Sequence, residues 1–151
     1  MNAASPLSSD LPSGAGQRHA PPHILVINDT QEILDLFRDL LEDEGYRVTL
    51  SSFAFQEVRD VVRIAPDLVI LDFLIGDEAK GWQMLQKMRM YRPTEKLPVV
   101  VCTAALALVR ELEGHLLTKQ VVVVLKPFDV DELLEVVRIA LDPESMPGAP
   151  R

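Results

Sequence analysis

The short apolar runs of this chain are followed at once by polar side chains of types that bind metals and anions, namely Asn28, Asp29, Asp72, Thr103 and Lys126. Carboxylates are hard oxygen donors suited to Mg²⁺, which takes one or two of them together with phosphate oxygens. A carboxylate is also a competent nucleophile toward a phosphoryl group, with an acyl phosphate as the product. An ammonium and a hydroxyl can donate to phosphoryl oxygens. If these side chains lie together, the set is suited to carrying a phosphoryl group.

The residues before these side chains predict the strands of a sheet. Five apolar runs recur, at 24–27, 48–50, 68–71, 99–101 and 121–125. Four of them are continuous instead of alternating, which is typical of strands buried on both faces. The segments between them have helical periodicity, and we expect helices at about 30–44, 55–65, 82–91, 105–117 and 130–141. This alternation predicts a three-layer α/β fold in which helices cover both faces of a five-stranded parallel sheet.

Each predicted helix has one apolar face. We expect Asp29 or Thr30 to cap the first helix and Gly45 to end it. The residues expected to face the sheet are Ile33, Leu34, Phe37, Leu40, Leu41, Val58, Val61, Val62, Ala65, Trp82, Leu85, Met88, Leu108, Val109, Leu112, Leu116, Leu133, Leu134, Val137 and Leu141. Because ligands of open α/β sheets gather beyond the carboxyl ends of the strands, the polar residues converge if the first, third, fourth and fifth strands are central.

The length of 151 residues is close to that of one domain. Ala, Ser, Pro and Gly fill 14 of the first 22 positions, a composition that buries too little apolar surface to fold. We therefore expect a disordered leader over residues 1–22, a folded domain over 23–142 and a flexible tail over 143–151. The folded part, about 120 residues, suffices for one core without room for a second effector domain.

The charge balance excludes two classes of direct partner. The formal net charge is −8, and residues 23–142 hold 21 acidic against 13 basic side chains. This balance argues against binding to nucleic acid and to anionic membranes. With neither an 18-residue apolar run nor a signal-peptide pattern, we expect a cytoplasmic protein. The single cysteine, Cys102, follows three valines and is expected to be a small buried hydrophobe.

Taken in order, the polar residues resemble the receiver domain of two-component response regulators, of the stand-alone, chemotaxis-regulator-like type. The resemblance covers about residues 23–141. It implies a flavodoxin-like, doubly wound sheet with the strand order 2-1-3-4-5, and a cis peptide bond before Pro127. It rests on Asn28-Asp29, on Asp72 in Asp-Leu-Val-Ile-Leu-Asp, on Thr103 in Leu-Pro-Val-Val-Val-Cys-Thr-Ala and on Lys126-Pro127-Phe128.

The resemblance also implies a role for each residue. Asp72 would be the phosphoacceptor, taking the phosphoryl group from a sensor histidine kinase or a histidine phosphotransfer protein in a phosphorelay. Mg²⁺ would be bound by Asp29, by Asp72 and by the backbone carbonyl of Leu74, with Asn28 reaching the ion through water. Thr103 would supply the switch hydroxyl, and Lys126 would be the lysine that the family typically has in the Lys-Pro-Phe turn. The output would be a contact with a downstream protein target.

Three positions depart from the family pattern. Asn28 stands where the first member of an acidic pair is usual, which removes one charge from the metal site and weakens Mg²⁺ binding. The loop 73–81 lacks the usual proline and is one residue longer, although Asp77 or Glu78 can add negative charge. Val123 replaces the usual aromatic switch residue.

An apolar surface remains for the output in place of that switch. This surface consists of Val123 together with Val136 and Ile139, which lie off the predicted inward stripe of helix 130–141. They indicate either ordinary edge packing or a docking or homodimer face formed by helix 105–117, strand 121–125 and helix 130–141.

Other functions remain open at this point. A pseudo-receiver of the same fold would work by protein contact without phosphorylation. A phosphatase of the haloacid dehalogenase type needs an acid two residues after the nucleophile, where this chain has Leu74. A dinucleotide-binding domain needs glycines in the first turn, and residues 28–31 contain none. We therefore expect a phosphoacceptor instead of an enzyme with turnover.

Overall fold

A computed structural model of the chain describes residues 20–52, 58–75, 78–114 and 121–142. Most of the expected leader and all of the expected tail lie outside these ranges. The same holds for the start of the second predicted helix, for Leu116 and for Asp77.

The strands form one five-stranded parallel sheet with the order β2-β1-β3-β4-β5. This confirms the predicted strand order. Each strand coincides with a predicted apolar run to within two residues at either end. Their bounds are β1 His23–Ile27, β2 Arg47–Ser51, β3 Leu68–Leu71, β4 Val99–Thr103 and β5 Val121–Leu125.

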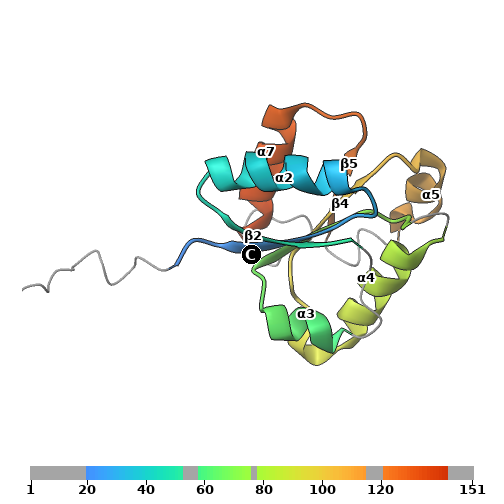
Figure 1. Ribbon diagram of the computed structural model, residues 1–151. Coiled ribbons are helices and arrows are strands. Elements are labelled where there is room, and N and C mark those ends of the chain that lie inside the picture. The colour runs from blue at the N-terminus through green and yellow to red at the C-terminus, as the bar shows by residue number, and fades with distance from the viewer. Residues whose placement is uncertain (1–19, 53–57, 76–77, 115–120, 143–151) are drawn as a thin grey trace, which may run out of the picture.

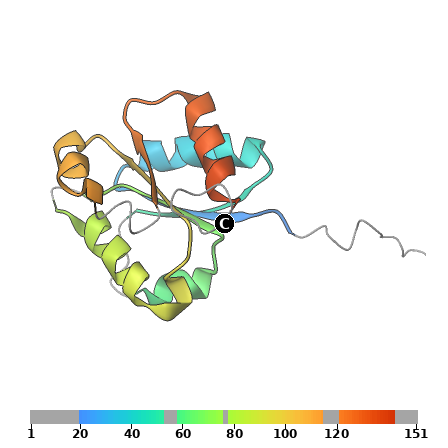
Figure 2. The same cartoon turned by 180° about the vertical axis from the view of Figure 1, so that it is seen from behind.

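Helices cover both faces of the sheet (Figures 1 and 2). Helices α2 (Gln31–Asp43) and α7 (Val130–Ala140) pack on one face. Helices α3 (Arg59–Ile64), α4 (Lys80–Met90) and α5 (Leu106–Glu111) pack on the other, with the short 3₁₀ helix η1 (Arg92–Thr94) after α4. Within the described part, the longest helix has 13 residues, and none is long and apolar enough to cross a bilayer.

Alternation along the strands divides the core into two clusters. In β1, Ile24 and Val26 face α2 and α7, whereas Leu25 and Ile27 face α3 and α4. The central strand β3 is buried at every residue. Because side chains of a strand point alternately to its two faces, a continuous apolar run is what a sheet covered on both sides needs.

Three predicted helices differ in detail from the structure. Val62 and Ala65, expected to face inward, are exposed. Ala65 has φ 56° and ends α3 in the left-handed conformation, so the inward stripe of α3 stops at Ile64. Helix α4 begins at Lys80, two residues earlier than predicted. None of the residues of α5 is fully buried, although Leu108 and Val109 pack against the core.

Candidate functional site

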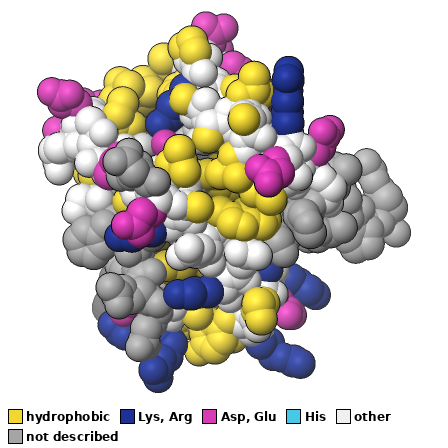
Figure 3. All heavy atoms as spheres, turned by 90° about the vertical axis from the view of Figure 1, so that its right-hand side faces the viewer, with side chains coloured by type: hydrophobic (Ala, Val, Ile, Leu, Met, Phe, Trp, Pro, Cys, Tyr) yellow, Lys and Arg dark blue, Asp and Glu magenta, His cyan; other side chains and the backbone are white. Residues whose placement is uncertain are grey.

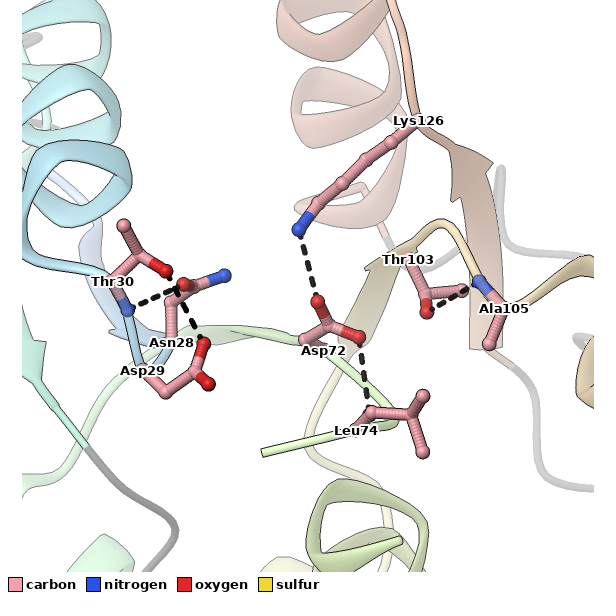
Figure 4. Close-up of polar contacts among 8 residues, drawn as sticks. All are labelled: Asn28, Asp29, Thr30, Asp72, Leu74, Thr103, Ala105 and Lys126. Carbon is pink, nitrogen blue, oxygen red and sulfur yellow. Dashed lines mark hydrogen bonds and ion pairs between the residues drawn. The ribbon is translucent and has the colours of Figure 1, made fainter. Parts of the chain in front are cut away.

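Asp72 directly follows β3 and lies at the centre of the site (Figure 4). Its Oδ2 is 2.9 Å from Lys126 Nζ, and its Oδ1 accepts a hydrogen bond of 3.1 Å from the backbone N–H of Leu74. The Asp72 side chain is 13% exposed. Both carboxylate oxygens therefore have a donor, and the group stays within reach of a reactant from solvent.

Thr103, the last residue of β4, lies beside Asp72 (Figure 4). Its side chain is buried, and its Oγ1 accepts a hydrogen bond of 3.1 Å from the backbone N–H of Ala105. The Thr103 carbonyl accepts a hydrogen bond of 2.9 Å from the backbone N–H of Lys126. The predicted cis peptide bond between Lys126 and Pro127 is confirmed. The backbone hydrogen bond between Lys126 and Thr103 therefore holds the carboxyl ends of β4 and β5 together at the two residues whose side chains enter the site.

The first strand contributes Asn28 and Asp29 on the opposite side of Asp72 (Figure 4). Asn28 is 4% exposed, and its Oδ1 accepts a hydrogen bond of 2.9 Å from the backbone N–H of Thr30. Asp29 is exposed. Thr30 occupies the N-cap position of α2, as predicted, but its side chain makes no capping hydrogen bond to the backbone of the helix.

The five predicted polar residues therefore gather at the carboxyl edge of the sheet. Lys126 and Asp72 are in direct contact, and Thr103 is linked to Lys126 through the backbone. Asn28 and Asp29 face the same space from β1 (Figure 4). This convergence follows from the strand order. Strands β1, β3, β4 and β5 lie next to one another in the sheet, and β2 lies outside them at the edge beside β1.

The sequence reasoning missed a close approach between α4 and the phosphoacceptor candidate. Gly81 donates its backbone N–H to the Phe73 carbonyl at 3.0 Å, and a Cβ at Gly81 would lie 1.7 Å from the Asp72 carbonyl oxygen. Phe73 in turn packs edge-on against Trp82, with ring centroids 5.7 Å apart. A glycine at the first turn of a predicted helix, close behind a functional loop, was the available signal.

The loop after Asp72 turns back on itself before α4. Ile75 donates its N–H to the Glu78 carbonyl at 3.0 Å. The Glu78 carboxylate is exposed and lies 4.0 Å from Lys80 Nζ. Asp77, the other acid of this loop considered above, lies outside the described residues.

The donor set fits Mg²⁺. Asp29, Asp72 and the Leu74 carbonyl are all oxygen donors, and Mg²⁺ takes only one or two carboxylates when phosphate oxygens and water complete its shell. Among the described residues, no group of three or more His, Cys, Asp or Glu side chains is placed to hold a metal by itself.

Cys102 precedes Thr103 but is excluded as a competing nucleophile. It is buried, as predicted, and burial raises the pKa of its thiol to about 12, an effect that the nearby Lys126 charge only partly opposes. The thiolate is the reactive form of cysteine, so this side chain is inert at neutral pH.

The geometry agrees with the comparisons. A model of the response regulator receiver domain matches residues 24–138. The chain is 32% identical over 126 residues to the DNA-binding dual master transcriptional regulator RpaA of Synechocystis, an alignment that covers 80% of this chain and 49% of that protein. The chain thus spans about half the length of this curated relative.

Solved structures show the same fold. A sensor protein from Polaromonas sp. JS666 superposes with a TM-score of 0.70 at 25% identity, over 80% of this chain and 96% of that one. The receiver domain of the sensor histidine kinase PA1611 from Pseudomonas aeruginosa PAO1 has a TM-score of 0.67 at 23% identity, over 81% and 98%, and its structure has a magnesium ion coordinated in the active site cleft. With its predicted sheet, its polar strand ends and this match over most of its length, the chain belongs to the response regulator receiver domain family.

Proposed function

We propose that Asp72 accepts a phosphoryl group from a phosphohistidine of a sensor histidine kinase or a histidine phosphotransfer protein. Receiver domains typically accept a phosphoryl group on an aspartate with Mg²⁺, and they partner with histidine kinases. The observation that carries the proposal is the placement of Asp72, partly exposed at the end of β3 with Lys126 Nζ at 2.9 Å. In the transfer, a carboxylate oxygen of Asp72 bonds to phosphorus as the phosphorus–nitrogen bond to the histidine breaks.

The neighbouring side chains have complementary roles in this proposal. Lys126 supplies a positive charge to a phosphoryl oxygen, and the Thr103 hydroxyl supplies a hydrogen-bond donor to another. Asp29, Asp72 and the Leu74 carbonyl would hold Mg²⁺. When bound, the ion neutralises charge on the transferred group and on the attacking carboxylate.

The test is intact-mass spectrometry after incubation with Mg²⁺ and acetyl phosphate or phosphoramidate. The protein should gain the mass of one phosphoryl group, and Asp72→Asn should gain none. Lys126→Met should react more slowly while its circular dichroism spectrum matches that of the unmodified chain. An adduct that persists in Asp72→Asn, or no adduct in either protein, contradicts the proposal.

The second candidate is a pseudo-receiver that signals without phosphorylation. Asn28 in place of an acid and Val123 in place of an aromatic residue favour it, because each departs from the usual phosphorylation switch. The same mass measurement separates the two candidates, since a pseudo-receiver gains no phosphoryl group under conditions in which its fold is intact.

We also propose that the output is a protein contact through the face of α5, β5 and α7, including homodimer formation. Val123, Val136 and Ile139 are half-buried, and Leu106 and Leu125 are 41% and 39% exposed. Viewed from the side of α5, hydrophobic side chains gather in the middle of the molecule (Figure 3). The receiver would bind its downstream target, or a second copy of itself, when Asp72 is phosphorylated.

Sedimentation velocity with and without acetyl phosphate measures this association. We expect a phosphorylation-dependent increase in mass in the unmodified chain and its loss in Leu125→Asp. Leu36→Asp is the matched control, because Leu36 is similarly exposed, at 44%, on helix α2, which is not part of the proposed face. If both variants lose association equally, this face is not the interface.

A further inference from the structure

The side-chain amide of Asn28 has a fixed orientation. Its Oδ1 accepts a hydrogen bond from the Thr30 backbone N–H at 2.9 Å. A backbone N–H can only donate, so the atom that faces it must be the carbonyl oxygen and not the amide nitrogen. The –NH₂ group of Asn28 is therefore the end that points away from α2.

That –NH₂ group points into the space in front of Asp72 and Lys126 (Figure 4). Asn28 is 4% exposed, and its Nδ2 has no hydrogen-bond acceptor among the residues that the structure describes. Leaving a buried donor unpaired costs about 1–3 kcal/mol, so buried polar groups almost always have partners. An unpaired donor that faces a functional site indicates that its acceptor arrives with a ligand.

Thr103 has the same arrangement on the other side of Asp72. Its Oγ1 accepts a hydrogen bond from the Ala105 N–H, so its hydroxyl proton remains available. Its side chain is 1% exposed, and within the described ranges this proton has no acceptor either. With the ammonium group of Lys126, the site therefore offers three donors from β1, β4 and β5.

We infer that Asn28 is a hydrogen-bond donor to an anionic oxygen bound at Asp72, and not a ligand of the metal shell. The inference rests on the proposed function, in which that oxygen belongs to the phosphoryl group. An amide –NH₂ carries partial positive charge, so it opposes a cation and stabilises an anion. Compared with the usual acidic residue, Asn28 therefore weakens the binding of Mg²⁺ and adds a direct hydrogen bond to the phosphoryl group.

Asn28→Asp is the variant that isolates this contact. It keeps an oxygen to accept the Thr30 N–H, and it exchanges the –NH₂ donor for a second anionic oxygen. We expect Asn28→Asp to bind Mg²⁺ about tenfold more tightly than the unmodified chain in the absence of phosphate, as measured by titration of backbone amide shifts. An unchanged affinity would overturn the part of the inference in which the Asn28 amide stands in place of a group that attracts the metal, whereas the phosphoryl contact itself is tested by the next measurement.

The contact itself is observed through the side-chain –NH₂ protons of Asn28 in a ¹⁵N-labelled protein, assigned by their disappearance in Asn28→Asp. Mg²⁺ alone should leave them nearly unchanged. Addition of acetyl phosphate should shift one of them downfield, because a hydrogen bond to a charged oxygen is shorter and stronger than one to water.

The outcomes separate this inference from the proposed function. A shift with Mg²⁺ alone and none on phosphorylation identifies a water-mediated metal contact and overturns the inference. A phosphoryl adduct on Asp72 without a shift overturns the inference and leaves the proposed function intact. No adduct by mass overturns both.

Discussion

At the residue scale, three strand ends use the same local hydrogen bond. Asn28, Asp72 and Thr103 each accept the backbone N–H of the residue two positions later. Short polar side chains commonly bond to nearby backbone in this way. The bond holds one atom of each side chain in place and directs the rest toward a common centre. The site is therefore positioned by the chain leaving each strand, before any ligand binds.

Gly81 is the residue whose replacement should disturb this centre most directly. Gly81→Ala places a Cβ against the Asp72 carbonyl, at 1.7 Å before relaxation, so α4 must move away from the loop. We expect a loss of about 1–3 kcal/mol in the free energy of unfolding in urea, and slower phosphorylation of Asp72. Gly114→Ala is the control, since nothing lies within 4 Å of its added Cβ. Equal effects of the two substitutions would contradict the role of Gly81.

Cys102 should make stability sensitive to alkaline pH. Burial raises the pKa of its thiol from an ordinary value of 9.0 to about 12. The unfolded chain therefore releases the thiol proton first, and stability present below about pH 9 declines as the pH rises toward 12. Urea unfolding from pH 7 to 10.5 should show a steeper decline for the unmodified chain than for Cys102→Ala. Parallel pH profiles would show that the thiol does not contribute.

At the element scale, the corner between α4 and η1 determines how β4 enters the sheet. Thr94 is 2% exposed, and its hydroxyl donates to the Met88 carbonyl at 2.7 Å. Arg89 donates to the Thr94 carbonyl at 3.2 Å. Because these bonds satisfy carbonyl groups at the end of a helix, they let the chain turn sharply toward Val99.

Thr94→Val should destabilise this corner. The substitution keeps the shape of the side chain and removes the donor to the Met88 carbonyl. A loss of about 1 kcal/mol in the free energy of unfolding is expected from one buried hydrogen bond, because the Met88 carbonyl keeps the Tyr91 N–H as a donor at 3.3 Å. Thr94→Ser restores the hydroxyl and should recover most of the loss in the same urea titration. If Thr94→Ser is as unstable as Thr94→Val, the methyl group and not the hydroxyl matters.

At the scale of the whole molecule, the negative charge is concentrated on one layer. Helices α2 and α7 lie on the same face of the sheet (Figure 1) and carry many more acids than bases. The acids are Glu32, Asp35, Asp39, Glu42, Asp43, Asp131, Glu132 and Glu135, and the bases are Arg38 and Arg138. The opposite layer holds most of the described arginines and lysines. Figure 3 shows several Lys and Arg side chains at the lower end of the face that it draws.

The acidic side chains of α2 and α7 repel one another, and added salt should weaken this repulsion. Sodium chloride at 0.5 M screens interactions between charges that are more than about 4–5 Å apart. We therefore expect the salt to raise the urea midpoint of unfolding, and the free energy of unfolding to increase by about 1 kcal/mol. Asp43→Lys, in the last turn of α2, should raise stability at low salt and reduce the response to salt, because a cation there also suits the helix dipole. A midpoint that falls with added salt would contradict this account.

The sequence by itself determined the strands, the layers and the family. A continuous apolar run such as Leu68–Leu71 can be recognised as a strand from the sequence, because a strand buried on both faces has an apolar residue at every position. The polar residues that follow them could be named for the same reason, since each stands directly after such a run. The prediction that Val62 and Ala65 face inward was wrong, because both residues are exposed. The short helix α3 ends at Ala65, which has the left-handed conformation, and the periodicity of apolar residues does not reveal where a helix ends.

Only the tertiary structure decided how the site is assembled. The 1.7 Å approach at Gly81 and the orientation of the Asn28 amide depend on backbone groups of other segments or of the following turn. Such contacts are set by the distances between packed elements, and a linear pattern of residue types contains no distances. The sequence therefore determined which groups stand at the edge of the sheet, and the fold decided which atom of each faces Asp72.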